Sequence, residues 1–410
     1  MIVRSALNCS TCGHHHVVRI GLGHEERHVH RFPCRKCGED IEVALEADFE
    51  KIGTRTVPVT NCSLSEDIWG SEIVNLDANF VIPAEYQGQD KVFPRMEQMH
   101  ALAIKAESMG ASFVPVDIDD PRMQQRPFRR PDYLAEWKEL KRAWTLYRRG
   151  QDVFSRGIIK KISAELYPRE PLGGLADWLF RLAVQVQGRS GAGLFRATAD
   201  RLKAALGTAE FSNFREHYNL FMQSKRGRIY LSIISDYFDQ YSEFVQVQFL
   251  VSGGMPPSED EMVSSTNFDK TKMFYGNAFE ALADQVDLVA MINNILQGRN
   301  FDTFEQLTLK KYYEIDKAGR ANCFLAEPSL ASITSEFDNQ IRNASHHGGM
   351  EFDPVTQIIK YKAGKAGTGA ENEMTYTAYL VRCVTIFSQL LRLLAIELML
   401  TKQAALKEPL

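Results

Sequence analysis

The end of the chain carries an arginine, an asparagine and a histidine close together. Arg342 is followed directly by Asn343 and, after four intervening residues, by His347. A guanidinium is a permanent cation that suits phosphate, and an imidazole exchanges a proton near neutral pH. Cleavage of an RNA phosphodiester without a metal ion requires both functions. These residue types therefore indicate phosphodiester chemistry, if the surrounding elements hold them together.

The spacing alone does not single out this run. Two other arginines, Arg19 and Arg95, are also followed by a histidine after four residues. The first pair falls on a predicted hairpin, and the second opens an ordinary predicted helix. Arg342 and His347 instead fall at the end of a helix predicted at 328–345, which glycines stop within a helical region.

Apolar residues recur on this predicted helix every three or four positions, so one face should pack into a helical core. They are Leu330, Ile333, Phe337, Ile341 and Ala344. Arg342, Asn343 and His347 lie off this stripe, which predicts a position at the mouth of a bundle. Asp338 and Asn339, about one turn earlier, either orient Arg342 or are ordinary surface residues.

The whole chain has the composition of a globular protein with more than one domain. It has 410 residues, of which 44% are hydrophobic and 24% charged, and a net charge of −4. This charge gives no overall attraction to nucleic acid, so any basic surface must be local. The most apolar segment is interrupted by Arg382 and Arg392, which predicts a buried helix and no membrane span. The first residues lack the apolar run of a signal peptide, so a cytoplasmic location is expected.

Four of the seven cysteines form two CxxC pairs separated by 21 residues: Cys9, Cys12, Cys34 and Cys37. Each pair can direct two thiolates at one ion, and four thiolates complete a tetrahedral zinc shell. The pattern predicts a zinc ribbon at 1–50, in which structural Zn²⁺ supplies folding energy that so small a module lacks. Two β-prone runs between the pairs are expected to form a hairpin that carries the second pair.

Other residues near the cysteines leave alternatives open. Six histidines either form a second metal site or lie on a polar hairpin, solvated or next to the zinc: His14, His15, His16, His24, His28 and His30. The thiolates themselves either act in catalysis or redox chemistry or, with no open coordination position, only hold the fold together. Cys62, Cys323 and Cys383 stand alone and are expected to be small buried hydrophobic residues.

The rest of the chain divides into three further regions. Residues 51–93 alternate β-prone runs with glycine, proline and aspartate, which predicts an extended or β connector. Residues 94–207 are expected to form a helical region, and 208–410 a helical bundle that a long helix at 373–404 closes. The expected fold class is mainly α, with a small N-terminal β ribbon.

A basic stretch lies within the first helical region. Between 122 and 161, twelve Lys and Arg face four Asp and Glu, and aromatic residues are interleaved. This mixture can hold a phosphate backbone and stack a base. The expected RNA contacts are Arg129, Arg130, Lys141, Arg142, Arg148 and Arg149. One long or kinked helix is expected at 133–166. The alternative to RNA contact is that this region is an amphipathic helix whose aromatics face the core and whose cations are merely solvated.

At the run RNASHH the chain resembles the HEPN superfamily. Nucleases of this superfamily carry an arginine, then typically Asn, Asp or His, and a histidine after four to six intervening residues. Arg342, Asn343 and His347 match this pattern. The following run, GGMEFDPVTQIIKYK, is similar to the Asp-containing β excursion found in a group of bacterial members. The resemblance covers roughly residues 210–410 and leaves out the zinc ribbon and the basic stretch.

The resemblance implies a metal-independent endoribonuclease that works as a homodimer or higher homo-oligomer. Two motifs would face each other across a composite cleft, and no catalytic metal is expected. His347 would act as the general base on the ribose 2′-hydroxyl or as the general acid on the leaving 5′-oxygen. Arg342 would neutralise charge on the phosphorane, and Asn343 would orient the phosphate or His347. The products would be a 2′,3′-cyclic phosphate and a 5′-hydroxyl.

Some HEPN domains lack catalysis, which leaves a second class of function open. In that case Arg342 pairs with an acidic neighbour, His347 caps its helix, and the protein is a scaffold or a zinc-ribbon protein that binds RNA or a partner. Similar HEPN ribonucleases serve as toxins or as effectors of abortive infection. The resemblance therefore also implies an anti-phage role, with a phage trigger or an antitoxin as a further partner.

Overall fold

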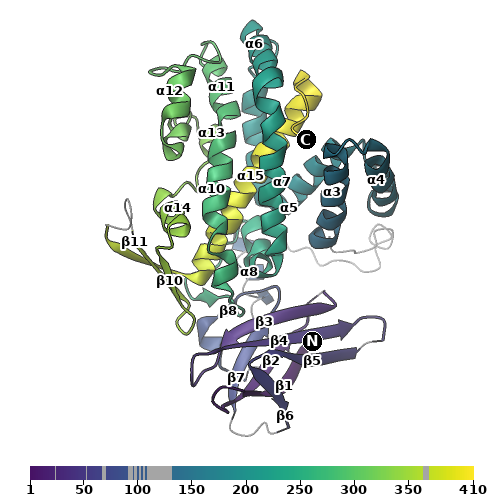
Figure 1. The fold of residues 1–410 in the computed structure, drawn as a ribbon, viewed down its shortest axis with the longest axis vertical. Coiled ribbons are helices and arrows are strands. Elements are labelled where there is room, and N and C mark those ends of the chain that lie inside the picture. Colours follow the sequence, from purple (N-terminus) through teal and green to yellow (C-terminus); the bar gives the residue numbers. More distant parts are fainter. Residues whose placement is uncertain are drawn as a thin grey trace.

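A computed structural model of the protein describes residues 1–23, 25–51, 53–66, 71–90, 132–362 and 369–410, with isolated positions between 96 and 108. Most of the helix predicted to open at Arg95, and the predicted RNA contacts Arg129 and Arg130, lie outside the described residues. The described part is a helical body that stands above a body of small β-sheets (Figure 1). The predicted mainly α class with an N-terminal β part is confirmed.

Two sheets form the β body. Their strands are β1 (Ile2–Cys9), β2 (His15–Gly21), β3 (Arg27–Pro33), β4 (Asp40–Asp48), β5 (Gly53–Thr60), β6 (Cys62–Ser65) and β7 (Glu72–Asp77). The first sheet has the order β6-β1-β2-β7 and the second β3-β4-β5. Apolar side chains from both sheets, such as Val18, Ile20, Ile41 and Val43, are fully buried in one small core.

The predicted hairpin between the cysteine pairs is wrong. β2 pairs with β1 and β7, whereas β3 pairs with β4, so the two β-prone runs lie in different sheets. Residues 51–77 also do more than connect, because β5 pairs with β4, β6 with β1, and β7 runs parallel to β2. The first 50 residues alone would leave these strand edges without hydrogen-bond partners.

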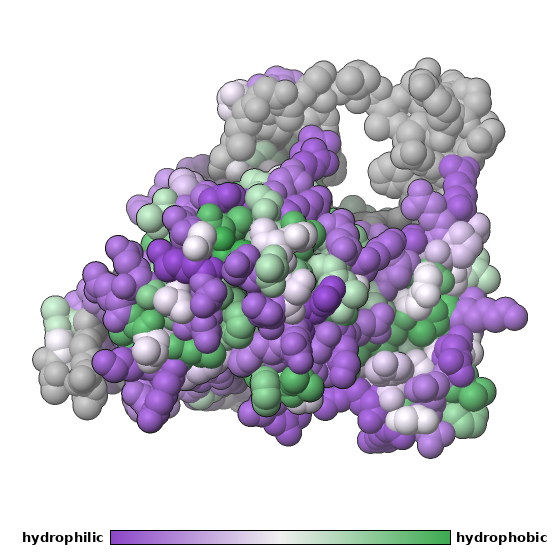
Figure 2. Space-filling view, turned by 90° about the horizontal axis from the view of Figure 1, so that it is seen from above, coloured by the Kyte–Doolittle hydropathy of each residue, from purple (hydrophilic) through white to green (hydrophobic). Residues whose placement is uncertain are grey.

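Fifteen helical elements in the described residues form the upper body. They are α3 (Tyr133–Arg148), α4 (Asp152–Leu166), α5 (Leu175–Lys203), α6 (Ala209–His217), the π-helix η2 (Tyr218–Met222), α7 (Gln223–Asp239), α8 (Tyr241–Ser252), α9 (Phe268–Thr271), α10 (Phe274–Gln285), α11 (Asp287–Leu296), α12 (Leu309–Glu314), the 3-10 helix η3 (Lys317–Cys323), α13 (Pro328–Ala331), α14 (Asn339–His346) and α15 (Tyr376–Ala404). Their upper end presents a mostly hydrophilic surface with scattered apolar patches (Figure 2).

The last helix is the core of this body. α15 packs against α5, α8 and α10. Its length and apolar composition would suit a membrane span, but 89% of its most apolar window is buried inside the protein. This burial agrees with the predicted buried core helix.

Two predicted helices, the long or kinked one at 133–166 and the one at 328–345, are each divided in two. Residues 133–166 form α3 and α4, because Gly150 takes a positive φ of 71° in the turn between them. The helix predicted at 328–345 is also divided, since α13 ends at Ala331 and α14 begins at Asn339. Asp338 starts the new helix by accepting the backbone N–H groups of Gln340 and Ile341. Such an N-cap begins a helix wherever the preceding turn has left the helical path.

The β excursion after α14 is present as predicted. β10 (Met350–Asp353), β11 (Ile358–Lys362) and β12 (Glu371–Thr375) form an antiparallel sheet beside α14. The two bodies meet at a further strand pair, β8 (Ile82–Pro83) with β9 (Glu261–Met262). The short helix η1 (Ala84–Tyr86) follows β8 in the chain. Ser264 reinforces this junction, because its hydroxyl donates to the Asp77 carbonyl at 3.0 Å and accepts the Asp77 N–H at 2.8 Å.

Candidate functional site

The four cysteines converge from two hairpin turns of different sheets. In each turn a glycine N–H donates to the carbonyl of the first cysteine, Gly13 to Cys9 and Gly38 to Cys34, both at 2.9 Å. The two glycines have φ values of 68° and 75°, a conformation that strains residues with side chains. The repeated CxxCG turn therefore directs two sulfurs from each hairpin into the same space.

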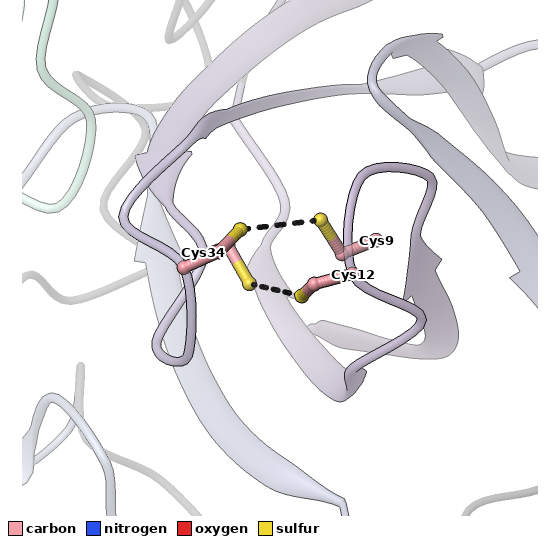
Figure 3. A group of neighbouring side chains, drawn as sticks. Cys9, Cys12 and Cys34 are labelled. Carbon is pink, nitrogen blue, oxygen red and sulfur yellow. Dashed lines mark hydrogen bonds between the residues drawn. The ribbon is translucent and has the colours of Figure 1, made fainter.

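The spacing of the sulfurs suits a tetrahedral ion. Cys9 Sγ lies 3.8 Å from Cys37 Sγ, and Cys12 Sγ lies 3.6 Å from Cys34 Sγ. All four sulfurs lie within 4.8 Å of one another and form no disulfide. The labelled side chains point toward a common centre (Figure 3). Tetrahedral Zn–S bonds of about 2.3 Å place sulfurs roughly 3.8 Å apart. The cluster can hold a structural metal such as zinc.

Asn61 ties the two cysteine turns together. Its side-chain N–H donates to Cys9 Sγ at 3.8 Å and to the Asp40 carbonyl at 3.1 Å, and its Oδ1 accepts the Thr11 hydroxyl at 2.8 Å. Burial raises the pKa of the Cys9 thiol, but the backbone N–H groups of Cys12 and Thr11 outweigh it and lower that pKa to about 7. These backbone contacts favour the thiolate of Cys9, whereas burial raises the pKa of the Cys34 thiol.

One of the two predictions for the histidines of the β body placed them on a polar hairpin, solvated or next to the zinc. The structure buries more of these side chains than that prediction expected. His16, His28 and His30 are buried, while His15 is exposed. His24 lies outside the described residues. His30 is fully buried, neither of its ring nitrogens has a hydrogen-bond partner among the described residues, and burial holds its pKa well below the usual value.

One group of described residues could form the second metal site of the other prediction. Ligand atoms of His14, His16 and Glu72 lie within 4.8 Å of one another. However, His16 Nε2 already accepts the backbone N–H of Arg35 at 3.2 Å. A metal would therefore have to use His16 Nδ1, which has no hydrogen-bond partner among the described residues. Three side chains that include the exposed Glu72 are not by themselves a metal site, and they carry no functional conclusion.

The arginine, asparagine and histidine of the C-terminal run lie together at the end of α14. His347 follows the helix, is exposed, and donates its backbone N–H to the Asn343 carbonyl at 3.0 Å. Gly348, with φ of 66°, turns the chain away in the left-handed conformation common after a helix. Arg342 and Asn343 are half-buried, one turn earlier on the helix.

Arg342 is held on one side by a carboxylate from α10. Its Nε donates to Glu280 Oε1 at 2.5 Å, and its Nη2 forms an ion pair with the same oxygen. Its Nη1 donates to Asn343 Oδ1 at 2.7 Å. A guanidinium has five N–H donors, so three are engaged. The other two have no partner among the described residues, and the side chain is 25% exposed.

Glu280 belongs to a wider row of charges. Lys317 Nζ lies 2.6 Å from Glu280 and 2.8 Å from Asp284, and Arg320 lies 2.9 Å from Asp284. Burial raises the pKa of Glu280, but hydrogen bonds from Lys317 and Arg342 outweigh it and hold the pKa below its usual value. Glu280 is therefore ionised at neutral pH. Three cations share two carboxylates, which leaves a local excess of positive charge beside Asn343.

Asp338 does not orient Arg342, which was one of its two predicted roles. It caps α14, and its carboxylate accepts from Arg382 at 3.3 Å. Arg342 and His347 make the contacts that the non-catalytic alternative expects, an acidic partner and a helix cap. Neither contact blocks catalysis, since part of the guanidinium stays open and the His347 ring is exposed.

The predicted RNA contacts that can be placed lie on or beside α3. Lys141, Arg142 and Arg149 line one groove, and Arg148 is exposed beside it. Two of the aromatic residues that were expected to stack on bases are buried and therefore not accessible to RNA. Trp137 and Trp144 are 2% and 0% exposed in the core, because they occupy the helix face opposite the cations. Both parts of the amphipathic alternative are therefore present, a buried aromatic face and an exposed basic one.

No family model, curated protein or solved structure matches this chain. Function is therefore inferred from the side chains described above. The sequence prediction missed Glu280 and Asn61, which contact candidate site residues, and Lys317, which contacts Glu280. No local pattern could have identified Glu280, which lies 62 positions before Arg342 in the chain. Asn61 carries a weak signal, because its positive φ of 53° is more common for asparagine.

Proposed function

We propose that this protein is a metal-independent endoribonuclease of the HEPN type, active as a cytoplasmic homodimer, with Arg342, Asn343 and His347 as its catalytic residues. One observation carries the proposal. Arg342 is fixed on one side by Glu280 and Asn343, keeps two N–H groups open, and lies one turn before the exposed His347.

The open side of Arg342 suits a phosphate that gains charge. Two N–H groups in one plane can donate to two phosphate oxygens. Because Glu280 and Asn343 hold the guanidinium beforehand, little reorganisation is needed when the phosphorane forms. Glu280 would reduce the positive charge at this point, but Lys317 shares its carboxylate.

His347 would move the proton. Attack by the ribose 2′-oxygen forms a bond to phosphorus and breaks the bond from phosphorus to the 5′-oxygen. One His347 would accept the 2′-hydroxyl proton, and the His347 of a second copy would give a proton to the leaving 5′-oxygen. The exposed position of His347 supports this division, because its ring is open to a second chain.

RNA cleavage by the metal-loaded protein tests the proposal, in buffer without added divalent ions. New ends should carry a 2′,3′-cyclic phosphate and a 5′-hydroxyl. Arg342→Ala and His347→Ala should each slow cleavage by at least about a hundredfold, the usual contribution of an acid–base group. His15→Ala is the matched control, since it removes an exposed histidine from the β body.

Two results would contradict the catalytic proposal. Both motif variants could cut RNA as fast as the wild type, or wild-type cleavage could disappear when trace divalent ions are removed without loss of the structural metal. Light scattering of the wild type tests the dimer separately. A protein that cuts RNA only as a monomer would contradict the two-chain site.

The Arg342–Glu280 ion pair favours a second candidate, a non-catalytic scaffold that binds RNA or a protein partner. In that case the wild type retards RNA on a gel and never cuts it, and Arg342→Ala lowers stability without changing any product. The product analysis above therefore separates the two candidates.

A role as a toxin or anti-phage effector follows only from the HEPN resemblance, with a phage trigger or an antitoxin as the further partner. Expression in a bacterial host should slow growth, and His347→Ala should restore it. A wild-type protein that remains harmless under every phage challenge tried would count against this role.

A further inference from the structure

A basic groove lies far from the α14 motif. It has a volume of about 460 Å³ and is lined by Lys138, Lys141, Arg142, Thr145, Leu146, Arg149 and Phe154. Six of these residues come from α3 or the residue after it, and Phe154 comes from the first turn of α4. We call it the α3–α4 groove. In Figure 1, α3 and α4 lie on the right of the helical body and α14 on the left.

The groove follows from the amphipathic pattern of α3. Its lining residues recur every three or four positions, so they share one face of the helix. The opposite face holds Trp137, Leu140 and Trp144, which are at most 2% exposed. The buried face fixes the rotation of α3, and the cations therefore point away from the core.

The charge of the groove is only weakly offset. Its lining contains four cations and no acidic residue. The acidic partners stand at its rim, where Asp239 lies 3.8 Å from Lys141 and Glu139 lies 3.9 Å from Arg142. Asp239 is 70% exposed, and exposed pairs at such distances contribute little. An anion entering the groove would meet cations that bind no competing carboxylate tightly.

An exposed aromatic ring lies at the same place. Phe154 is 64% exposed although it borders the groove, and Leu146 adds a second apolar surface. A flat ring beside cations offers stacking to a nucleobase while its phosphates bind lysine and arginine. The lining therefore suits a ligand with a planar apolar part and a charged part.

The size of the groove separates two kinds of nucleotide ligand. Ligand pockets of roughly 300 to 1,000 Å³ hold single small molecules, so this groove has room for about one nucleotide. An RNA strand brings one phosphate for each nucleotide and would leave most of the four cations unmatched. A nucleoside triphosphate concentrates its phosphates beside one base.

We propose that the α3–α4 groove binds a nucleoside triphosphate, with the phosphates on Lys138, Lys141, Arg142 and Arg149 and the base against Phe154. This binding site is separate from the proposed catalytic motif and does not depend on RNA cleavage.

Calorimetric titration of the full-length, metal-loaded protein with ATP and GTP tests this site. One molecule should bind per chain. The double variant Lys141→Gln, Arg142→Gln should bind at least about tenfold more weakly, since a hydrogen bond to a charged group contributes roughly 1.5–3 kcal/mol. Phe154→Ala should weaken ATP binding but leave the affinity for inorganic triphosphate unchanged.

Matched controls come from the same helical body. Arg156 and Lys160 are exposed on α4 outside the groove, so Arg156→Gln, Lys160→Gln removes the same charge. Phe221→Ala is the control for Phe154→Ala, because Phe221 on η2 is 66% exposed and so matches Phe154. Both controls should bind ATP as the wild type does, and all variants should keep the wild-type circular dichroism spectrum.

A wild type that binds neither nucleotide at millimolar concentration would overturn the proposal. Equal loss of affinity in the groove variants and the charge control would also overturn it, because it would show non-specific attraction. A short oligouridine titration is the third arm. If oligouridine binds at the groove and ATP does not, the groove holds an RNA strand and the triphosphate proposal is wrong.

Discussion

The β body and the helical body are stabilised in opposite ways. The core of the β body contains few side chains, and its two sheets meet at the four-cysteine cluster. The helical body has an extensive core around α15 and a buried ion network in which Arg226 contacts both Asp287 and Glu397. The smaller body has a cluster that can hold a structural ion, whereas the larger one buries an extensive core of its own side chains.

The same difference separates the two candidate sites. The four sulfurs can supply a complete coordination shell from one chain. Arg342 and His347 are positioned by their chain but stay open on one side. A closed site suits a structural role, and an open one can accept a substrate or a second chain. Each body can be perturbed to test this contrast.

Loss of one cysteine ligand should have the largest effect. Cys12→Ser should remove the metal and unfold the β body, because a structural zinc contributes on the order of 10 kcal/mol to a small module. Metal content and the far-ultraviolet circular dichroism spectrum measure the loss. Cys323→Ser is the control, since Cys323 lies in η3, away from the cluster. A Cys12→Ser protein with full metal content and intact strands would break the contrast.

In the helical body, loss of one buried charge should lower stability by less than loss of a cysteine ligand does. Glu397 is fully buried and accepts from Arg226 at 2.5 Å, from Tyr218 at 2.5 Å and from Tyr230 at 2.7 Å. Glu397→Gln should lower the free energy of unfolding by about 3–5 kcal/mol, because it leaves a buried arginine partly unpaired. Urea unfolding measures this change.

The matched substitution for this test lies on β12. Glu373 pairs with Lys360 at 3.2 Å, and both side chains are at least half exposed. Glu373→Gln should leave the free energy of unfolding nearly unchanged because water screens this pair. Equal effects of the two substitutions would show that the buried network adds nothing to stability.

The contact between Glu280 and Arg342 can be tested in the proposed cleavage reaction. Glu280→Gln should slow RNA cleavage by about ten- to a hundredfold, since a misplaced Arg342 loses its alignment with phosphate. The effect should fall on kcat rather than KM, and the melting temperature should change little. Asp284→Asn is the control, because Asp284 contacts Lys317 and Arg320 but not Arg342. Faster cleavage by Glu280→Gln would mean that Glu280 restrains Arg342 instead of positioning it.

The smallest effect concerns acid sensitivity of the β body. Burial lowers the pKa of His30 well below its unfolded value of about 6.5. The unfolded chain therefore binds a proton that the folded chain excludes, and stability falls as pH drops below about 6.5. His30→Leu should reduce the stability lost between about pH 7.5 and pH 5.5 by on the order of 1 kcal/mol.

Urea unfolding at both pH values measures this difference. Acid also protonates the cysteine thiolates, but this contribution is common to the wild type and the variant. An unchanged pH dependence in His30→Leu would show that His30 is not neutral in the folded protein.

Local pattern was sufficient for several features of this protein. The two CxxC pairs identified the cysteine cluster, and the apolar period predicted the core positions Ile341 and Ala344 of α14. The long apolar segment predicted α15. These features depend on neighbours within a few residues, so ligand spacing and periodicity carry them.

Tertiary structure decided the rest. Pairing of β2 with β7 and of β4 with β5 made a body of two sheets from an expected ribbon and connector. Rotation of α3 buried Trp137, and the turn into α4 left Phe154 exposed beside the cations. Glu280 reached Arg342 from another helix. Each outcome depends on contacts between segments that are distant in the chain. The sequence determines the energies of these contacts, but their geometry is established only when the chain packs.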